Sequence, residues 1–112
     1  MTLRQKQSLF VQLVARLILE ARRSGYDLTL GEAYRSPEEA ARLAKAGKGI
    51  AASLHTQRLA IDFNIFREGH YLTKTEAYHP LGEYWESLDP SCRWGGRFGD
   101  GNHFSITHGG KK

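Results

Sequence analysis

SLHTQRLAIDFNIF, residues Ser53–Phe66, is the stretch that decides the fold, and it requires a partner in WGGRFGDGNHF, residues Trp94–Phe104. The first stretch contains His55 and Asp62, and the second contains His103. Two imidazoles and one carboxylate form a ligand set that zinc accepts, with a fourth coordination position left for water. We therefore expect the fold to bring these two segments together around one metal ion.

Residues 60–66 alternate in a way that predicts a β-strand with one face on the core. The odd-numbered residues are apolar and would face the core, whereas the even-numbered residues from 60 to 64, with Asp62 in the middle, would face a cleft. A second strand is predicted over residues 103–106. If the two strands are antiparallel neighbours, the side chains of His55, Asp62 and His103 can converge on one point.

Helices are predicted before and between these strands. Residues 3–23 carry apolar side chains at three- and four-residue steps, which predicts an amphipathic helix. Ser36 is a candidate N-cap for a helix over residues 37–46, with Pro37 in the first turn and Glu39 closing a capping box. The remaining predicted elements are a helix over residues 75–88, weakened by Gly82, and strands over residues 27–34 and 71–73.

The size and composition of the chain indicate one globular domain, residues 1–112. Hydrophobic residues make up 40% and charged residues 25%, as in soluble proteins. No apolar run approaches the roughly 18 residues of a spanning helix, so we expect no stable membrane insertion. Polar residues interrupt the basic N-terminal region, which we interpret as a helix of the fold and not as a signal peptide. We therefore expect the protein to be made in a cytoplasm.

The net charge of +4 favours polyanionic partners such as nucleic acid, anionic lipid or an acidic cell wall. The basic residues are scattered along the sequence, so charge alone does not choose among these partners. Cys92 is the single cysteine, which excludes an internal disulfide, and we interpret it as a small buried residue.

A carboxylate and a cation near the metal would complete a hydrolytic site. Asp100 lies three residues before His103 and between two glycines, which would let the backbone turn sharply and aim the carboxylate at the metal. A carboxylate in that position can serve as general base and general acid. Arg35 is the candidate for stabilising an oxyanion. Spacing alone leaves three other histidines open as ligands: His70, His79 and His108.

Taken together, these motifs resemble the LAS zinc peptidases, which include VanY/VanX-type D-Ala-D-Ala peptidases and phage L-alanyl-D-glutamate endolysins. The resemblance is carried by Ser53–His55 followed by Ala60–Asp62, by Trp94–Gly96, and by Asp100–Phe104. The segment EAYRSPEE, residues 32–39, is similar to the family region in which an arginine contacts the reacting substrate.

The resemblance implies a role for each matching residue. Asp100 would be the catalytic acid and base, and Arg35 would contact the substrate and steady the tetrahedral intermediate. Ser53 would hydrogen-bond near the substrate or near the metal ligands. The implied zinc ligands are His55, Asp62 and His103.

The resemblance also implies the fold, an α+β domain of the hedgehog/D-Ala-D-Ala-peptidase type with a small antiparallel sheet and about three helices. Arg58 is a departure, because it stands where the family usually has glycine. A side chain at this position restricts positive φ angles and adds a charge near the cleft.

The function that the resemblance implies is that of a monomeric, zinc-dependent phage endolysin. It would hydrolyse the L-Ala-D-Glu bond of peptidoglycan stem peptides and lyse the host, reaching the wall from the host cytoplasm by a holin-dependent route. A D-Ala-D-Ala carboxypeptidase or dipeptidase is the alternative. A non-catalytic wall-binding module and a metal-dependent nuclease are weaker alternatives; we expect no nucleic-acid partner, because the basic residues do not cluster around the metal segments.

Overall fold

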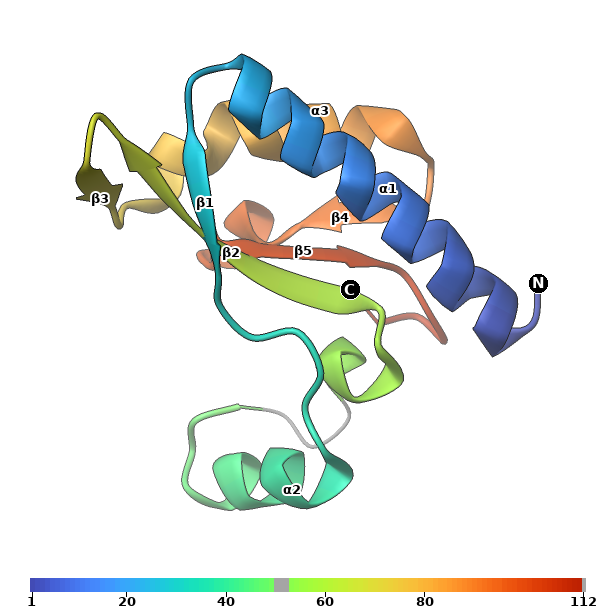
Figure 1. Ribbon diagram of the computed structural model, residues 1–112. Coiled ribbons are helices and arrows are strands. Elements are labelled where there is room, and N and C mark those ends of the chain that lie inside the picture. The colour runs from blue at the N-terminus through green and yellow to red at the C-terminus, as the bar shows by residue number, and fades with distance from the viewer. Residues whose placement is uncertain (50–52, 112) are drawn as a thin grey trace.

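The strand β2 (Ala60–Arg67) is the centre of an antiparallel sheet in the computed structural model, which describes residues 1–49 and 53–111 (Figure 1). The α+β class expected from the sequence, with a small antiparallel sheet and about three helices, is confirmed. Among the described residues the helices are α1 (Leu3–Arg23), α2 (Pro37–Lys45) and α3 (His79–Leu88), the other strands are β1 (Asp27–Leu30), β3 (His70–Leu72), β4 (Cys92–Trp94) and β5 (His103–Ile106), and short 3-10 helices are η1 (Leu54–Gln57), η2 (Thr75–Tyr78) and η3 (Gly95–Phe98).

The sheet has the strand order β1–β2–β5–β4, and β3 pairs with β2 as well. The strand β5 pairs with the first residues of β2, and β3 pairs with its last residues. The register places Asp62 directly opposite His103. The expectation that these two strands are antiparallel neighbours is therefore confirmed, and the pairing brings together residues from distant parts of the sequence.

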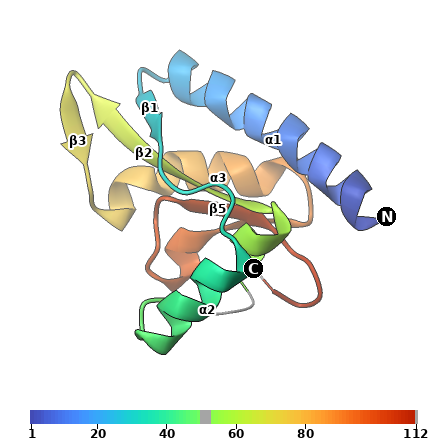
Figure 2. The ribbon, with the colours of Figure 1, turned by 60° about the horizontal axis from the view of Figure 1, so that its bottom comes forward.

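Two helices lie together on one side of the sheet, α1 and α3, whereas α2 lies apart at the opposite end of the molecule (Figures 1 and 2). The apolar stripe of α1 buries Phe10, Leu13, Leu17 and Ala21. The ring of Phe10 meets that of Trp85 in α3 edge to face, with centroids 5.8 Å apart. Each large apolar side chain buried in this way contributes roughly 1.5–3 kcal/mol, so the core between helices and sheet holds the strands that carry the site.

Trp94 at the end of β4 fixes the loop that follows it. Its indole is buried, and Nε1 donates a hydrogen bond of 2.7 Å to the carbonyl oxygen of Gly101. A Cβ atom on Gly82 of α3 would lie 2.1 Å from this indole. The glycine that weakens the helix prediction is therefore required, because it leaves room for a ring that anchors the segment before His103.

The strand predicted over residues 27–34 is shorter in the structure and ends at Leu30. Beyond it, the amide of Gly31 donates to the carbonyl oxygen of Asp62 (2.8 Å), and the amide of Asp62 donates to the carbonyl oxygen of Glu32 (2.7 Å). Gly31 and Glu32 thus lie opposite the single residue Asp62, which is the arrangement of a β-bulge. The bulge ends regular pairing and directs the chain past Asp62.

Two helix predictions need correction. The helix predicted over residues 75–88 is divided into η2 and α3, because Pro80 has no amide hydrogen and suits only the first turn of a new helix. In α2, Ser36 caps the Glu39 amide as predicted, but the capping box is wrong. The carboxylate of Glu39 pairs with Arg42 one turn later instead of reaching back.

Two strand predictions also need correction. The sequence pattern does not predict β4, because a strand of three residues carries too little local pattern. Its pairing with β5 is what makes it a strand. Ala60, expected on the cleft face of β2, is 2% exposed and belongs to the core. Cys92 is buried as interpreted.

No helix in residues 1–49 or 53–111 is both long and apolar enough to cross a membrane.

Candidate metal centre

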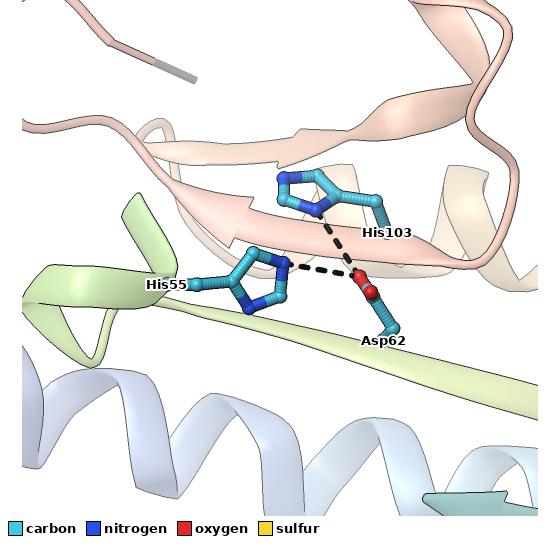
Figure 3. A group of neighbouring side chains, drawn as sticks. All are labelled: His55, Asp62 and His103. Carbon is cyan, nitrogen blue, oxygen red and sulfur yellow. Dashed lines mark hydrogen bonds and ion pairs between the residues drawn. The ribbon is translucent and has the colours of Figure 1, made fainter. Parts of the chain in front are cut away.

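Three side chains converge beside the centre of the sheet: His55 from η1, Asp62 from β2 and His103 from β5 (Figure 3). Both imidazoles point at one carboxylate oxygen. Nε2 of His55 lies 3.3 Å and Nδ1 of His103 lies 3.2 Å from Oδ1 of Asp62. The candidate ligand atoms all lie within 4.8 Å of one another. The sequence placed these three residues in one site, and the structure brings all three together.

The spacing of these atoms suits a small cation. Ligand atoms held about 2.0–2.1 Å from a tetrahedral zinc ion lie about 3.3 Å from one another, which is close to the two His–Asp distances. Two neutral imidazoles and a carboxylate are the donor types that zinc accepts, so the residues present fit the ion.

His55 is fixed by three contacts outside this triad. The Ser53 side chain caps η1 and accepts a hydrogen bond of 3.1 Å from the backbone amide of His55. Nδ1 of His55 lies 2.8 Å from the carbonyl oxygen of Ala33. The carbonyl oxygen of His55 accepts from the backbone amide of Arg35 at 3.2 Å. The Ala33 carbonyl on Nδ1 is a partner of the type that sets the ring orientation and the tautomer of a metal-binding histidine.

The electrostatics of the triad favour a charged Asp62. Burial raises the pKa of Asp62, but the hydrogen bonds from His103 and His55 outweigh burial and hold this pKa below its ordinary value. Burial lowers the pKa of His55, but the bonds to Asp62 and to the Ala33 carbonyl outweigh it, and the pKa of His55 is raised. An ionised carboxylate between two imidazoles is a place where positive charge is stabilised.

The triad forms one wall of an open cleft of about 270 Å³. Asp100 and Arg35, predicted as the proton-transfer acid and the oxyanion partner, both line this cleft. So does Ser53, whose predicted substrate contact stays a prediction. The other lining residues are Lys48, Gly49, Leu54 and Phe98.

The loop that carries Asp100 is held by its backbone. The Asp100 amide donates to the carbonyl oxygen of Gly95 (2.9 Å), and the Asp100 carbonyl accepts from the amide of His103 (3.1 Å). Gly99, just before it, has φ +80°, a conformation that favours glycine. Desolvation by the surrounding protein raises the pKa of Asp100, and the charge of Asp62 adds to this, although both histidines oppose it.

The sequence of the site segments identifies the family. A family model described as D-alanyl-D-alanine carboxypeptidase matches residues 46–106, which is more than half of the chain. The chain belongs to this family. The resemblance to LAS-type zinc peptidases is thereby confirmed, and the family together with the His–Asp–His set supports a metallopeptidase. No curated protein sequence matches the chain.

Two solved structures share the fold of this carboxypeptidase-family chain. The L-Ala D-Glu endopeptidase ChiX of Serratia marcescens has a TM-score of 0.69 and 24% identity, covering 86% of this chain and 78% of that chain. A mutant of the vancomycin-resistance D,D-pentapeptidase VanY from the VanB-type cassette, in complex with Zn(II), has a TM-score of 0.59 and 18% identity. That alignment covers 88% of this chain and 71% of the other. At these identities the likeness concerns the fold.

Arg58, the departure from the family glycine, lies at the C-cap of η1 with φ +59°. It therefore keeps the left-handed conformation that glycine would adopt, which is strained for a residue with a side chain. Its guanidinium lies over the ring of Tyr34, 4.1 Å from the centroid. Such a contact contributes about 0.5–1 kcal/mol at an exposed site and offsets part of the strain.

Sequence reasoning gave no role to several groups around the cleft. The Ala33 carbonyl is part of the backbone and leaves no signal in a sequence, whereas Glu32, three residues before Arg35, is an acidic residue whose pairing could have been considered. Lys48 and Phe98 line the cleft without belonging to a motif. The three alternative histidines lie outside the residues that line it: His70 in β3, His79 paired with Glu83, and His108 beside Lys6.

Proposed function

We propose that this chain is a zinc-dependent peptidoglycan peptidase that hydrolyses the L-Ala-D-Glu bond of stem peptides. The observation that carries the proposal is the convergence of His55, Asp62 and His103 in a cleft that Asp100 and Arg35 also line. The match to the carboxypeptidase family and the fold shared with an L-Ala D-Glu endopeptidase support it.

The proposed mechanism gives each side chain one task. His55, Asp62 and His103 would hold the zinc ion. Zinc bound there would polarise the scissile carbonyl and lower the pKa of a bound water molecule toward neutral pH. Asp100 accepts the proton of the attacking water and passes it to the leaving amine, a role that its raised pKa supports.

Arg35 supplies the remaining charge. Its guanidinium lines the cleft and would donate hydrogen bonds to the oxyanion that forms when the carbonyl is attacked. Lys48 lines the same cleft and adds a second positive charge. Together they suit a substrate with free carboxylates, as peptidoglycan stem peptides have.

The bond that is cut can be tested by mass spectrometry of purified peptidoglycan digested with the zinc-loaded protein. The proposal predicts stem peptides beginning with D-Glu, released from glycan strands that retain L-Ala. Release of free D-Ala with stem peptides still attached would instead establish the carboxypeptidase alternative. No digestion by a protein of verified zinc content would contradict both.

We further propose that the protein acts as a phage endolysin and lyses the cell in which it is made. Its net charge of +4 supports an encounter with an acidic wall. Expression together with a holin should make a bacterial culture clear, and the Asp100→Ala variant should not. Equal clearing by both proteins would contradict a lytic role for the peptidase activity.

A further inference from the structure

Residues 31–35, which connect β1 to α2, are bonded to the candidate metal ligands along much of their length. Gly31 and Glu32 form the bulge opposite Asp62. Ala33 and Arg35 form hydrogen bonds with His55, through the Ala33 carbonyl and the Arg35 amide. The backbone of this segment is therefore fixed beside the site, and so are the points from which its side chains project.

The side chain of Glu32 pairs with the guanidinium of Arg35, through Oε1 and Nη2. The same oxygen lies 3.8 Å from Nδ1 of His55. The Arg35 side chain is 14% exposed, and in the part of the chain that the structure describes Glu32 is its one acidic partner within ion-pair distance. A guanidinium withdrawn from water is strongly destabilised when its partner is removed, so this pair determines where Arg35 lies.

The pairing leaves part of the guanidinium available to a ligand. Oε1 of Glu32 forms an ion pair with Nη2, whereas Nε of Arg35 is buried and has neither an ion-pair nor a hydrogen-bond partner among residues 1–49 and 53–111. A buried donor without a partner is uncommon in folded proteins, and a bound oxygen would satisfy it. An oxyanion formed beside the metal ligands is an oxygen of that kind.

Glu32 also reduces the repulsion between two cations. A divalent ion held by neutral imidazoles and one carboxylate keeps a net positive charge, and Arg35 adds another on the same cleft. The carboxylate of Glu32 contacts Arg35 and lies near His55, so its negative charge would offset part of the repulsion between Arg35 and a bound divalent ion.

We propose that Glu32 is a positioning residue for the reaction: its carboxylate holds Arg35 by Nη2 so that the remaining guanidinium donors face the reacting carbonyl. This inference rests on the proposed function. Glu32→Gln is a suitable variant, because it keeps the side-chain volume and the backbone hydrogen bond to Asp62. It removes only the charge that holds the guanidinium.

The first test is steady-state kinetics on a stem-peptide substrate. A guanidinium displaced by about 1 Å should lower kcat on the order of 10- to 100-fold, with KM little changed. The zinc content and the Tm of Glu32→Gln should stay at the wild-type values. Glu32→Asp, which restores the charge on a shorter side chain, should recover part of the kcat, and the exposed carboxylate variant Glu38→Gln should match wild type.

The decisive comparison is a double-mutant cycle with Arg35→Ala. If Glu32 acts through Arg35, Glu32→Gln should produce no further loss of kcat in the Arg35→Ala background. A full, additive loss in that background would contradict the inference, as would an unchanged kcat in the single variant. Loss of zinc from Glu32→Gln would contradict it too, because Glu32 would then act on the metal ligands.

A readout independent of catalysis separates this inference from the proposed function. In zinc-loaded wild-type protein, the Nε–H signal of Arg35 in ¹⁵N NMR spectra should be sharp and protected from exchange with water. In Glu32→Gln it should broaden or disappear. An Arg35 signal that is the same in both proteins would contradict the positioning role, whereas absence of peptidoglycan cleavage by wild type would contradict only the proposed function.

Discussion

Removing the carboxyl group of Asp100 should abolish peptide hydrolysis without affecting metal binding. It lines the cleft but is not one of the three groups that converge as ligands. Asp100→Ala should therefore keep its zinc, measured by elemental analysis, while hydrolysis of a stem peptide falls on the order of 10²- to 10⁴-fold, the range for a general acid–base residue. Unchanged turnover would remove Asp100 from the proposed mechanism.

At this scale the sequence is informative where chemistry restricts the residue type. His55, Asp62 and His103 could be singled out because few side chains bind zinc, and Asp100 because glycines flank an acid near one of them. Choosing them over three other histidines required the family motifs. The Ala33 carbonyl could not be chosen in this way, because a backbone oxygen has no sequence signal. The i,i+3 spacing of Glu32 and Arg35 is a signal, but it is too common in proteins to mark this pair as part of the site.

At the scale of elements, the contact between α3 and β4 is sensitive to a single methyl group. A Cβ on Gly82 would meet the Trp94 ring at 2.1 Å, and overpacking of this kind costs roughly 1–3 kcal/mol. The higher helix propensity of alanine returns only about 1 kcal/mol. Gly82→Ala should therefore lower the free energy of unfolding by up to about 2 kcal/mol in urea titrations.

The exposed position next to it provides the control for this substitution. Glu83→Ala lies on the same helix and should change the free energy of unfolding by less than about 0.5 kcal/mol. A Gly82→Ala protein more stable than wild type would show that the indole can move away, and that it does not fix the loop before His103.

The same two elements are linked by Glu86, which makes their contact dependent on pH. Burial raises the pKa of Glu86, but hydrogen bonds from Arg97 and from the Trp94 amide outweigh it and hold the pKa below the ordinary value of 4.5. Because the folded-state pKa is lowered, this contribution is present at neutral pH and is lost as the pH falls below about 4.5. The unfolding free energy of wild type should decline more steeply below that pH than that of Glu86→Gln.

Parallel declines in wild type and Glu86→Gln, measured by urea denaturation at several pH values, would contradict this link. The exposed Arg97 side chain limits the size of the effect, because solvent screens the pair.

Elements with a strong local pattern were predictable, and those that depend on a partner were not. The amphipathic period of α1 and the alternation of β2 define both elements in the sequence. In contrast, β4 exists because β5 offers it a pairing edge, and β1 ends at a bulge opposite Asp62. Neither the pairing edge nor the bulge is visible in the segment that forms it.

At the scale of the whole molecule, the sheet topology assembles the site. The pairing of β2 with β5 puts Asp62 opposite His103, η1 returns His55 to the same point, and the bulge after β1 brings Arg35 to the cleft. The antiparallel arrangement could be proposed from the sequence only as a condition for the site. Because β2 and β5 are far apart in the sequence, the local pattern of each strand cannot establish that they pair.

The central claim, that this topology builds a zinc site, is tested most directly by the metal content of the purified protein and its single variants. Elemental analysis should find one zinc ion per wild-type chain, a large loss in His55→Ala, Asp62→Ala and His103→Ala, and no loss in a His79→Ala control. Full zinc content in all three ligand variants, or a folded wild-type protein that takes up no zinc, would contradict the account.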